Sequence, residues 1–138
     1  MKRTFFTDRD LGKQFPAMLV VAGLTVERHA DFFPPDGSDE QWLEYCGRQG
    51  RVAITHNHRI RYVPNELAAV RRFKVRLLVV IGQAPTALLA HNFVHTLTRI
   101  EAVLDDLPAP AIVKVYRAAP AELAKRPEAP GRVEIWLQ

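Results

Sequence analysis

Short apolar runs alternate with longer amphipathic stretches along most of the chain, and this alternation restricts the possible folds more than any other feature. Five runs have the β-branched and aromatic composition of strands buried in a sheet: residues 4–7, 24–28, 52–55, 75–81 and 112–116. The run at 75–81 is the most hydrophobic, so we expect it to form a central strand. Because strands that alternate with helices are joined by right-handed crossovers, the sequence predicts a three-layer α/β/α sandwich around a mainly parallel, five-stranded sheet.

Helices are expected between these strands, and their ends carry residues that usually start and stop helices. The expected spans are about residues 15–22, 39–50, 64–73 and 85–107. Proline stands at the start of the last two. Ser38 or Asp39 is expected to cap the second, which ends near Gly47 or Gly50.

Length and composition indicate a globular protein without a membrane segment. The chain has 138 residues, of which 48% are hydrophobic and 25% are charged, which suits one domain with a buried core. No apolar run reaches the roughly 18 residues of a membrane helix, and the basic N-terminus is not followed by the apolar segment of a signal peptide. Cys46 lies at helical spacing from apolar neighbours, so we expect a buried thiol in a cytoplasmic protein.

Residues 118–138 differ from the rest of the chain and are expected to form an arm on a domain of residues 1–117. Three prolines lie between residues 118 and 131, which we interpret as a loose segment. The apolar run Val133–Leu137 then either adds an edge strand or docks on a partner. The arm is therefore a candidate contact for a homo-oligomer or for another protein.

Positive charge is concentrated in one stretch of a chain whose net charge is +4. Between residues 59 and 76 there are six basic residues and one acid, Glu66. A solvated helix face is one interpretation, and an RNA phosphate-binding surface is the other. The residues of the second interpretation are Arg59, Arg61, Arg71, Arg72 and Lys74.

Acidic and polar residues follow two of the expected strands. Asp8 and Asp10 come directly after the first strand, and the polar segment 55–58 follows the third. The carboxyl ends of parallel strands meet at one edge of a sheet, where Asp39 and Glu40 in a first helical turn can join them. Helix capping would explain the same residues. If the carboxylates do converge, a hard divalent cation such as Mg²⁺ or Mn²⁺ would balance their charge and suit phosphodiester hydrolysis.

Three stretches of the sequence, taken together, resemble the PIN-like domains related to VapC-type toxins. They are residues 5–12, 32–43 and 50–61, and the similarity extends over about residues 3–116. The resemblance implies a small Mg²⁺- or Mn²⁺-dependent ribonuclease, commonly the toxin of a toxin–antitoxin pair, with RNA and an antitoxin protein as partners.

The resemblance also implies roles for individual residues. Asp8 falls on the first metal-binding acid of the family, and Asp39, or alternatively Glu40, falls on the second. Asn57 stands where the family typically has an aspartate. The implied catalytic residues are thus Asp8, Asp39 and Asn57, and the implied metal ligands are Asp8, Asp10, Asp39 and Glu40.

Two other functions fit parts of this pattern. Asn57 brings no charge to a metal, so a catalytically weakened module that binds RNA or protein is one alternative. A small phosphohydrolase of the haloacid-dehalogenase kind is the other, because Asp8-x-Asp10 follows a strand and Thr55 ends another. The acidic pair Asp105-Asp106, however, ends a helix instead of following a strand. The neighbouring imidazoles of His56 and His58 either assist a softer metal or have no role.

Overall fold

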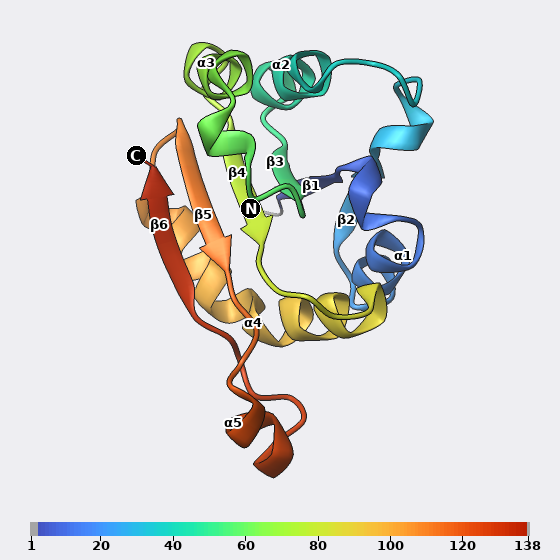
Figure 1. Ribbon diagram of the computed structural model, residues 1–138, viewed down its shortest axis with the longest axis vertical. Coiled ribbons are helices and arrows are strands. Elements are labelled where there is room, and N and C mark those ends of the chain that lie inside the picture. Colours follow the sequence, from blue (N-terminus) through green and yellow to red (C-terminus); the bar gives the residue numbers. More distant parts are fainter. Residues whose placement is uncertain (1–2, 138) are drawn as a thin grey trace.

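The computed structural model describes residues 3–137, except for the side chain of Arg61. A single six-stranded sheet forms the centre, and helices cover both of its faces (Figure 1). The strands are β1 (Thr4–Thr7), β2 (Thr25–Arg28), β3 (Val52–Thr55), β4 (Arg76–Val80), β5 (Ala111–Val115) and β6 (Val133–Leu137). The α-helices are α1 (Gln14–Val21), α2 (Asp39–Gln49), α3 (Pro64–Arg72), α4 (Thr86–Asp106) and α5 (Pro120–Lys125). Short 3-10 helices are η1 (Arg9–Leu11), η2 (His29–Asp31) and η3 (Ile60–Tyr62).

The strand order is β2-β1-β3-β4-β5-β6, and this arrangement confirms the predicted α/β/α fold. The first five strands are parallel, and β4 lies in the middle of the sheet beside β3, as its hydrophobic sequence predicts. The sixth strand, β6, pairs antiparallel with β5. The C-terminal apolar run is therefore an edge strand, which is one of the two alternatives that the sequence left open.

Two hydrophobic cores lie on opposite faces of the sheet, and the pair Phe5-Phe6 in β1 contributes to both. Phe5 packs with its ring edge against Phe93 of α4 at a centroid distance of 6.2 Å, in the core that α1 and α4 cover. Phe6 stacks on Trp42 of α2 at 5.8 Å, in the core under α2 and α3. Cys46 is fully buried in this second core, as predicted, and burial raises the pKa of its thiol far above the usual range.

Glycines explain where α2 ends and how closely it packs. Gly50 has φ of 68° and is the C-cap, so the helix ends there and not at Gly47. A Cβ atom on Gly47 would lie 2.1 Å from the carbonyl oxygen of Phe73, so glycine at this position lets α2 approach the end of α3. At the other end Ser38 is the N-cap, although its side chain makes no capping hydrogen bond.

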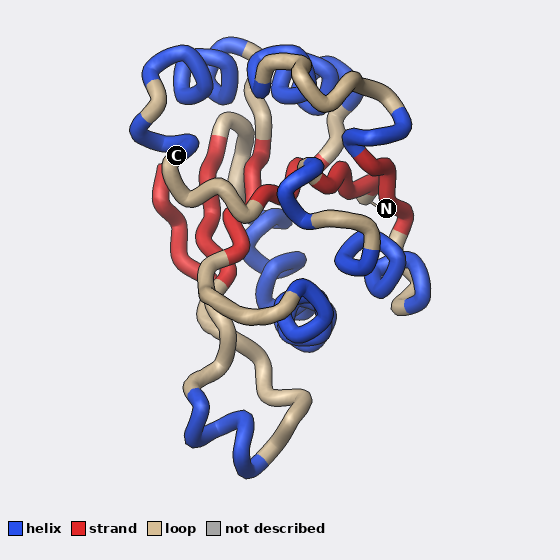
Figure 2. The backbone as a smooth tube through the Cα atoms, turned by 45° about the vertical axis from the view of Figure 1, so that its right-hand side comes forward, coloured by secondary structure: helices blue, strands red, loops and turns tan. Residues whose placement is uncertain are grey.

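The C-terminal arm is more ordered than a loose segment. It contains α5, which projects from the end of the sheet (Figure 2). Two buried polar residues of α4 hold both ends of this projection: Asn92 Oδ1 accepts a hydrogen bond from Ala118 N at 3.2 Å, and Thr96 Oγ1 accepts one from Gly131 N at 2.9 Å. The segment 118–131, which the sequence predicts to be loose, thus contains a short helix, and α4 supplies anchors at both of its ends that the arm's own sequence does not show.

Across residues 3–137, no helix combines the length and the apolar character that crossing a membrane requires.

Candidate active site

Parallel pairing of β1 with β3 brings the first two acidic residues next to Thr55. Thr7 lies in register with Ile54, and the backbone N–H of Asp8 donates to the carbonyl oxygen of Ile54 at 2.9 Å. The ends of both strands therefore lie side by side at the carboxyl edge of the sheet. This is the convergence that the sequence predicts.

The Thr55 hydroxyl lies between two carboxylates. Thr55 Oγ1 is 2.8 Å from Asp8 Oδ2 and 3.3 Å from Asp10 Oδ2. Asp10 also accepts from the backbone N–H of His56 at 3.2 Å. Asp8 Oδ1 accepts from Arg9 N at 2.7 Å, so Asp8 caps η1 as well as facing the site. Capping and convergence thus occur together at Asp8.

Their surroundings make these two carboxylates difficult to ionise. Asp8 is only 9% exposed, and burial, the charge of Asp10 and the charge of Asp39 together raise its pKa to about 7. Asp10 is exposed as a whole residue, but desolvation of its carboxyl group raises its pKa. Within the described part of the chain, neither carboxylate forms an ion pair with a lysine or arginine. The pair therefore lacks a counter-charge from the described side chains.

Asp39 joins the site from the first turn of α2, and Glu66 lies next to it in the first turn of α3. Asp39 Oδ1 accepts a hydrogen bond from Trp42 Nε1 at 2.9 Å, which fixes its orientation. Burial and a hydrogen bond to Asp39 raise the pKa of Glu66 to about 8. Sequence reasoning missed Glu66 as a site residue, although its place in a first helical turn matches that of Asp39. Of the two alternatives for the second acid, Asp39 lines the site, whereas Glu40 is exposed and does not.

Asp8, Asp10 and Asp39 line a surface depression, the acidic depression, and Asn57 lines it too. The amide oxygen of Asn57 already accepts a hydrogen bond. Asn57 Oδ1 accepts from the backbone N–H of Arg59 at 3.1 Å, and Asn57 N donates to Thr55 Oγ1 at 3.1 Å. These two bonds shape the loop after β3 in the way that asparagine commonly does in turns. Asn57 thus stabilises the loop that carries Thr55 and His56.

The carboxylates of Asp8 and Asp10 suit a hard cation that takes two of its ligands from the protein. No three His, Cys, Asp or Glu side chains in the described structure are arranged to hold a metal ion together. Mg²⁺ usually keeps several waters and is bound through one or two carboxylates. The adjacent, unbalanced carboxylates of Asp8 and Asp10 satisfy this smaller requirement.

The two histidines after β3 differ in their surroundings. His56 Nε2 lies 2.9 Å from the carbonyl oxygen of Gly82, at the end of β4, whereas His58 is exposed. Both line the acidic depression, and both also line a second cavity on the side of β5 and β6. They therefore separate the acidic residues from a neighbouring pocket.

The basic stretch of the sequence does not form one surface beside the acids. Arg59 lies near the site, but α3 then runs to the opposite edge of the sheet, where β4 begins in register with the start of β3. Arg71, Arg72 and Lys74 lie at that opposite edge, and the side chain of Arg61 lies outside the described structure. The basic residues are thus spread from the site to the opposite edge of the sheet, because the length of a helix separates residues that are close in sequence, and their contact with RNA stays a prediction.

Asp105 and Asp106 are also far from the acidic residues. They end α4 at the edge where β1 begins, and Arg3 forms ion pairs with Glu101 and Asp105 there. An acidic pair at the opposite edge of the sheet cannot complete a phosphatase site around Asp8. The haloacid-dehalogenase alternative therefore loses its support.

Comparison with protein families gives one finding. A family described as "PIN like domain" matches residues 3–82, more than half of the chain. No match was found among curated proteins or solved structures. The matched region contains β1 to β4 and the acids of the candidate site, Asp8, Asp10, Asp39 and Glu66, whereas β5, β6 and the arm lie outside it.

Proposed function

Because the chain belongs to the PIN-like domain family, whose members are generally nucleases, we propose that it is a divalent-metal-dependent endoribonuclease. The observation that carries the proposal is the pair of adjacent carboxylates, buried Asp8 and exposed Asp10, on either side of the Thr55 hydroxyl. Two acids held together without a basic partner, one of them buried, are costly unless a cation balances them. A folded enzyme retains such an arrangement where it serves binding or chemistry.

Asp8 and Asp10 would hold Mg²⁺ or Mn²⁺ directly, with Asp39 close enough to contribute through water. A bound ion of this kind activates water and stabilises charge on a phosphodiester. Thr55 keeps both carboxylates at the edge of the sheet, and Trp42 keeps Asp39 turned toward them. Glu66, whose pKa is about 8, carries a proton at neutral pH and so limits repulsion within the acidic cluster.

We further propose that this ribonuclease is the toxin of a toxin–antitoxin pair, because the chain resembles VapC-related domains. This role implies RNA as substrate and an antitoxin protein as inhibitor. Induced expression in a bacterial host should arrest growth for the parent protein and not for Asp8→Asn. Equal growth of the two strains would contradict the toxin role without affecting the nuclease proposal.

The nuclease proposal is tested by titrating Mg²⁺ and Mn²⁺ into the protein with a labelled single-stranded RNA. Asp8→Asn should abolish metal-dependent cleavage and keep the fold, because it removes charge and not packing. Asp106→Asn, an exposed acid at the opposite edge of the sheet, is the matched control and should cleave like the parent. Equal cleavage by parent and Asp8→Asn would place the site elsewhere.

One observation favours a second candidate, a PIN-like module that binds RNA without cutting it. The amide oxygen of Asn57 accepts a hydrogen bond from the N–H of Arg59 and is neutral, so this residue adds no negative charge to the acidic pair. The same titration separates the two functions, since RNA binding without cleavage at any metal concentration identifies the binding module.

A further inference from the structure

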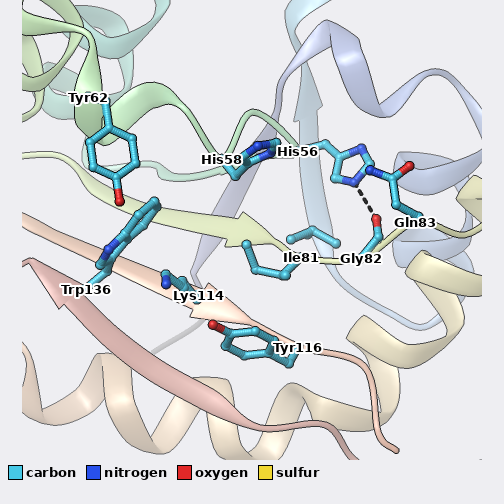
Figure 3. Close-up of a pocket in the computed structure, with 10 residues that line it drawn as sticks. His56, His58, Tyr62, Ile81, Gly82, Gln83, Lys114, Tyr116 and Trp136 are labelled. Carbon is cyan, nitrogen blue, oxygen red and sulfur yellow. Dashed lines mark hydrogen bonds between the residues drawn. The ribbon is translucent and has the colours of Figure 1, made fainter. Parts of the chain in front are cut away.

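A second cavity is lined by residues of the matched region together with Lys114 of β5, Tyr116 directly after β5 and Trp136 of β6 (Figure 3). This aromatic cavity has a volume of about 410 Å³. Its walls are formed chiefly by His56, His58, Tyr62, Lys114, Tyr116 and Trp136. His56 and His58 also line the acidic depression, so the two sites adjoin.

Flat rings and a cation shape this aromatic cavity. Tyr62, which is 70% exposed, lies edge-on to Trp136 at a centroid distance of 5.6 Å. Lys114 Nζ lies 4.2 Å from the centroid of the Trp136 ring and 3.7 Å from Glu134. Ile81 contributes an apolar surface between the two histidines on one side and Lys114 and Tyr116 on the other (Figure 3). Aromatic walls with a few polar groups suit a planar, partly polar ligand such as a nucleobase.

A third cavity, lined by arginines, shares a lining residue with the aromatic one. Its volume is about 350 Å³, and Tyr116 lines both. Arg99, Arg117 and Arg132 bring positive charge to this cavity, Glu122 also lines it, and Arg132 lies 3.7 Å from Glu134. The positive charge that remains suits a phosphate group.

Arg117 is the arginine least used by the protein itself. Its Nε is buried and has no hydrogen-bond partner in the described structure. Its side chain passes close to Gly82, whose carbonyl oxygen contacts His56. By contrast, Arg99 donates to Gly131 O at 2.8 Å, and Arg132 lies 4.2 Å from the Tyr116 ring centroid. Arg117 is thus close to the aromatic cavity, and it lines the third cavity, where its guanidinium group can meet a ligand.

We propose that β5, β6 and the arm form a binding path for single-stranded RNA that leads to Asp8 and Asp10. The aromatic cavity takes an unpaired base, and Arg117 with Arg132 holds a backbone phosphate beside it. The choice of RNA rests on the proposed ribonuclease function. A base inside this concave cavity cannot remain stacked in a duplex, so the path selects single strands. Strands β5 and β6, with Arg117 and Arg132, thus complete a binding path that Tyr62 and the histidines of the matched region begin.

Binding is measured with a short fluorescent oligoribonucleotide in the presence of EDTA, so that cleavage does not interfere. Arg117→Gln keeps most of the side-chain length and should raise Kd several-fold while flattening the slope of log K against log salt by about 0.7. Tyr62→Ala should raise Kd about tenfold, and Tyr62→Phe should restore most of this loss because it keeps the ring. Thermal unfolding of each variant checks that the fold is intact.

Arg71→Gln provides the comparison, since it removes the same charge at the opposite edge of the sheet. The proposal expects a smaller effect on Kd and on the salt slope from Arg71→Gln than from Arg117→Gln. An equal or larger effect from Arg71→Gln, or parent-like binding by both Arg117→Gln and Tyr62→Ala, would overturn it. Equal affinity for a duplex of the same sequence would also overturn it. Cleavage is assayed separately, so a parent protein that binds single strands through these residues without cutting them contradicts only the nuclease proposal.

Discussion

At the residue scale, one hydroxyl determines how the acidic pair is held. Thr55 Oγ1 has a single proton and two carboxylate neighbours, and Asp8 is the nearer. Thr55→Val keeps the shape of this fully buried side chain but leaves both carboxylates without the hydroxyl. We expect a loss of about 1–3 kcal/mol in the free energy of unfolding at neutral pH, measured by denaturant titration.

Thr98→Val in α4 is the matched control for this change, because Thr98 is exposed and should tolerate valine with little loss. A Thr55→Val protein as stable as the control variant would show that the hydroxyl is dispensable for the pair.

The raised pKa of Asp8 makes the stability of the metal-free protein depend on pH. The native pKa of about 7 lies above the ordinary value of 3.8, so the folded protein binds more protons than the unfolded chain between these values. Stability contributed by this group is therefore present at low pH and lost as the pH rises toward about 7. We expect a lower Tm at about pH 8 than at about pH 5 in EDTA.

Asp8→Asn should remove much of that difference, whereas Asp106→Asn should keep it. A metal-free parent whose Tm is the same at both pH values would contradict the burial of ionisable carboxylates at this edge.

Asn57→Asp tests whether the loop after β3 faces the proposed metal. An aspartate oxygen can still accept the hydrogen bond from Arg59 N, so the loop should be preserved while the site gains a charge. We expect Mn²⁺ affinity to rise at least about tenfold and the metal-free protein to lose stability at neutral pH. Calorimetric titration of both proteins measures the affinity. Unchanged affinity would leave Asn57 with its loop role alone.

The sequence predicted Asp8, Asp10 and Thr55 at one edge because strand ends are readable from local patterns. Glu66 could not be predicted in the same way. Its contact with Asp39 depends on the packing of α3 beside α2, and in the sequence it appears as a single acid among basic residues. The hydrogen bond from Arg59 N to Asn57 Oδ1 could not be predicted either, because residue types alone do not show which side chains bond to the backbone.

At the element scale, packing of α2 against α3 positions Asp39 beside Glu66. Gly47 permits this approach, since a Cβ atom there would lie 2.1 Å from the carbonyl oxygen of Phe73. Gly47→Ala should destabilise the protein by about 1–3 kcal/mol, although alanine normally favours a helix over glycine. It should also weaken metal-dependent cleavage, because α2 must shift and carry Asp39 with it.

Gly50→Ala is the comparison for this helix, because no atom would contact its Cβ and the expected cost comes only from φ of 68°. If Gly47→Ala lowered neither the unfolding free energy nor cleavage, close packing of the two helices would not be required. The sequence marked both glycines as possible ends of the helix, and only the neighbouring helix distinguishes them.

The direction of α3 also explains why the basic residues of 59–76, which are close in sequence, do not lie together beside the acidic residues. A helix of this length carries Arg71 and Arg72 to the edge opposite Asp8, whereas Arg59 stays near the site. The number of charges in a stretch of sequence does not show at which edge of the sheet each charged residue lies. Arg117 and Arg132 lie more than forty residues beyond this stretch, and only the pairing of β5 with β6 brings them together beside Tyr116.

At the scale of the whole molecule, the arm leaves the sheet after β5 and returns to it as β6. This return covers the edge of β5 and places Trp136 against the core under α2 and α3. The parallel five-stranded part of the fold was predictable from alternating patterns. The anchors Asn92 and Thr96 were not, because polar residues on a helix give no sign of their distant partners.

Deletion of residues 118–138 tests this role of the arm. The sequence alone favoured a folded domain after deletion, but the structure changes the expectation, because removing β6 exposes the hydrogen-bonding edge of an apolar strand. We expect the truncated protein to unfold at a lower temperature and to self-associate, with a larger mass in light scattering. A variant in which a short Gly-Ser loop replaces residues 120–127 keeps β6 and should retain the mass and Tm of the parent. A truncated protein with the mass and Tm of the parent would mean that β6 is not needed to complete the sheet, and a loop variant that self-associates would assign the assembly role to α5 instead.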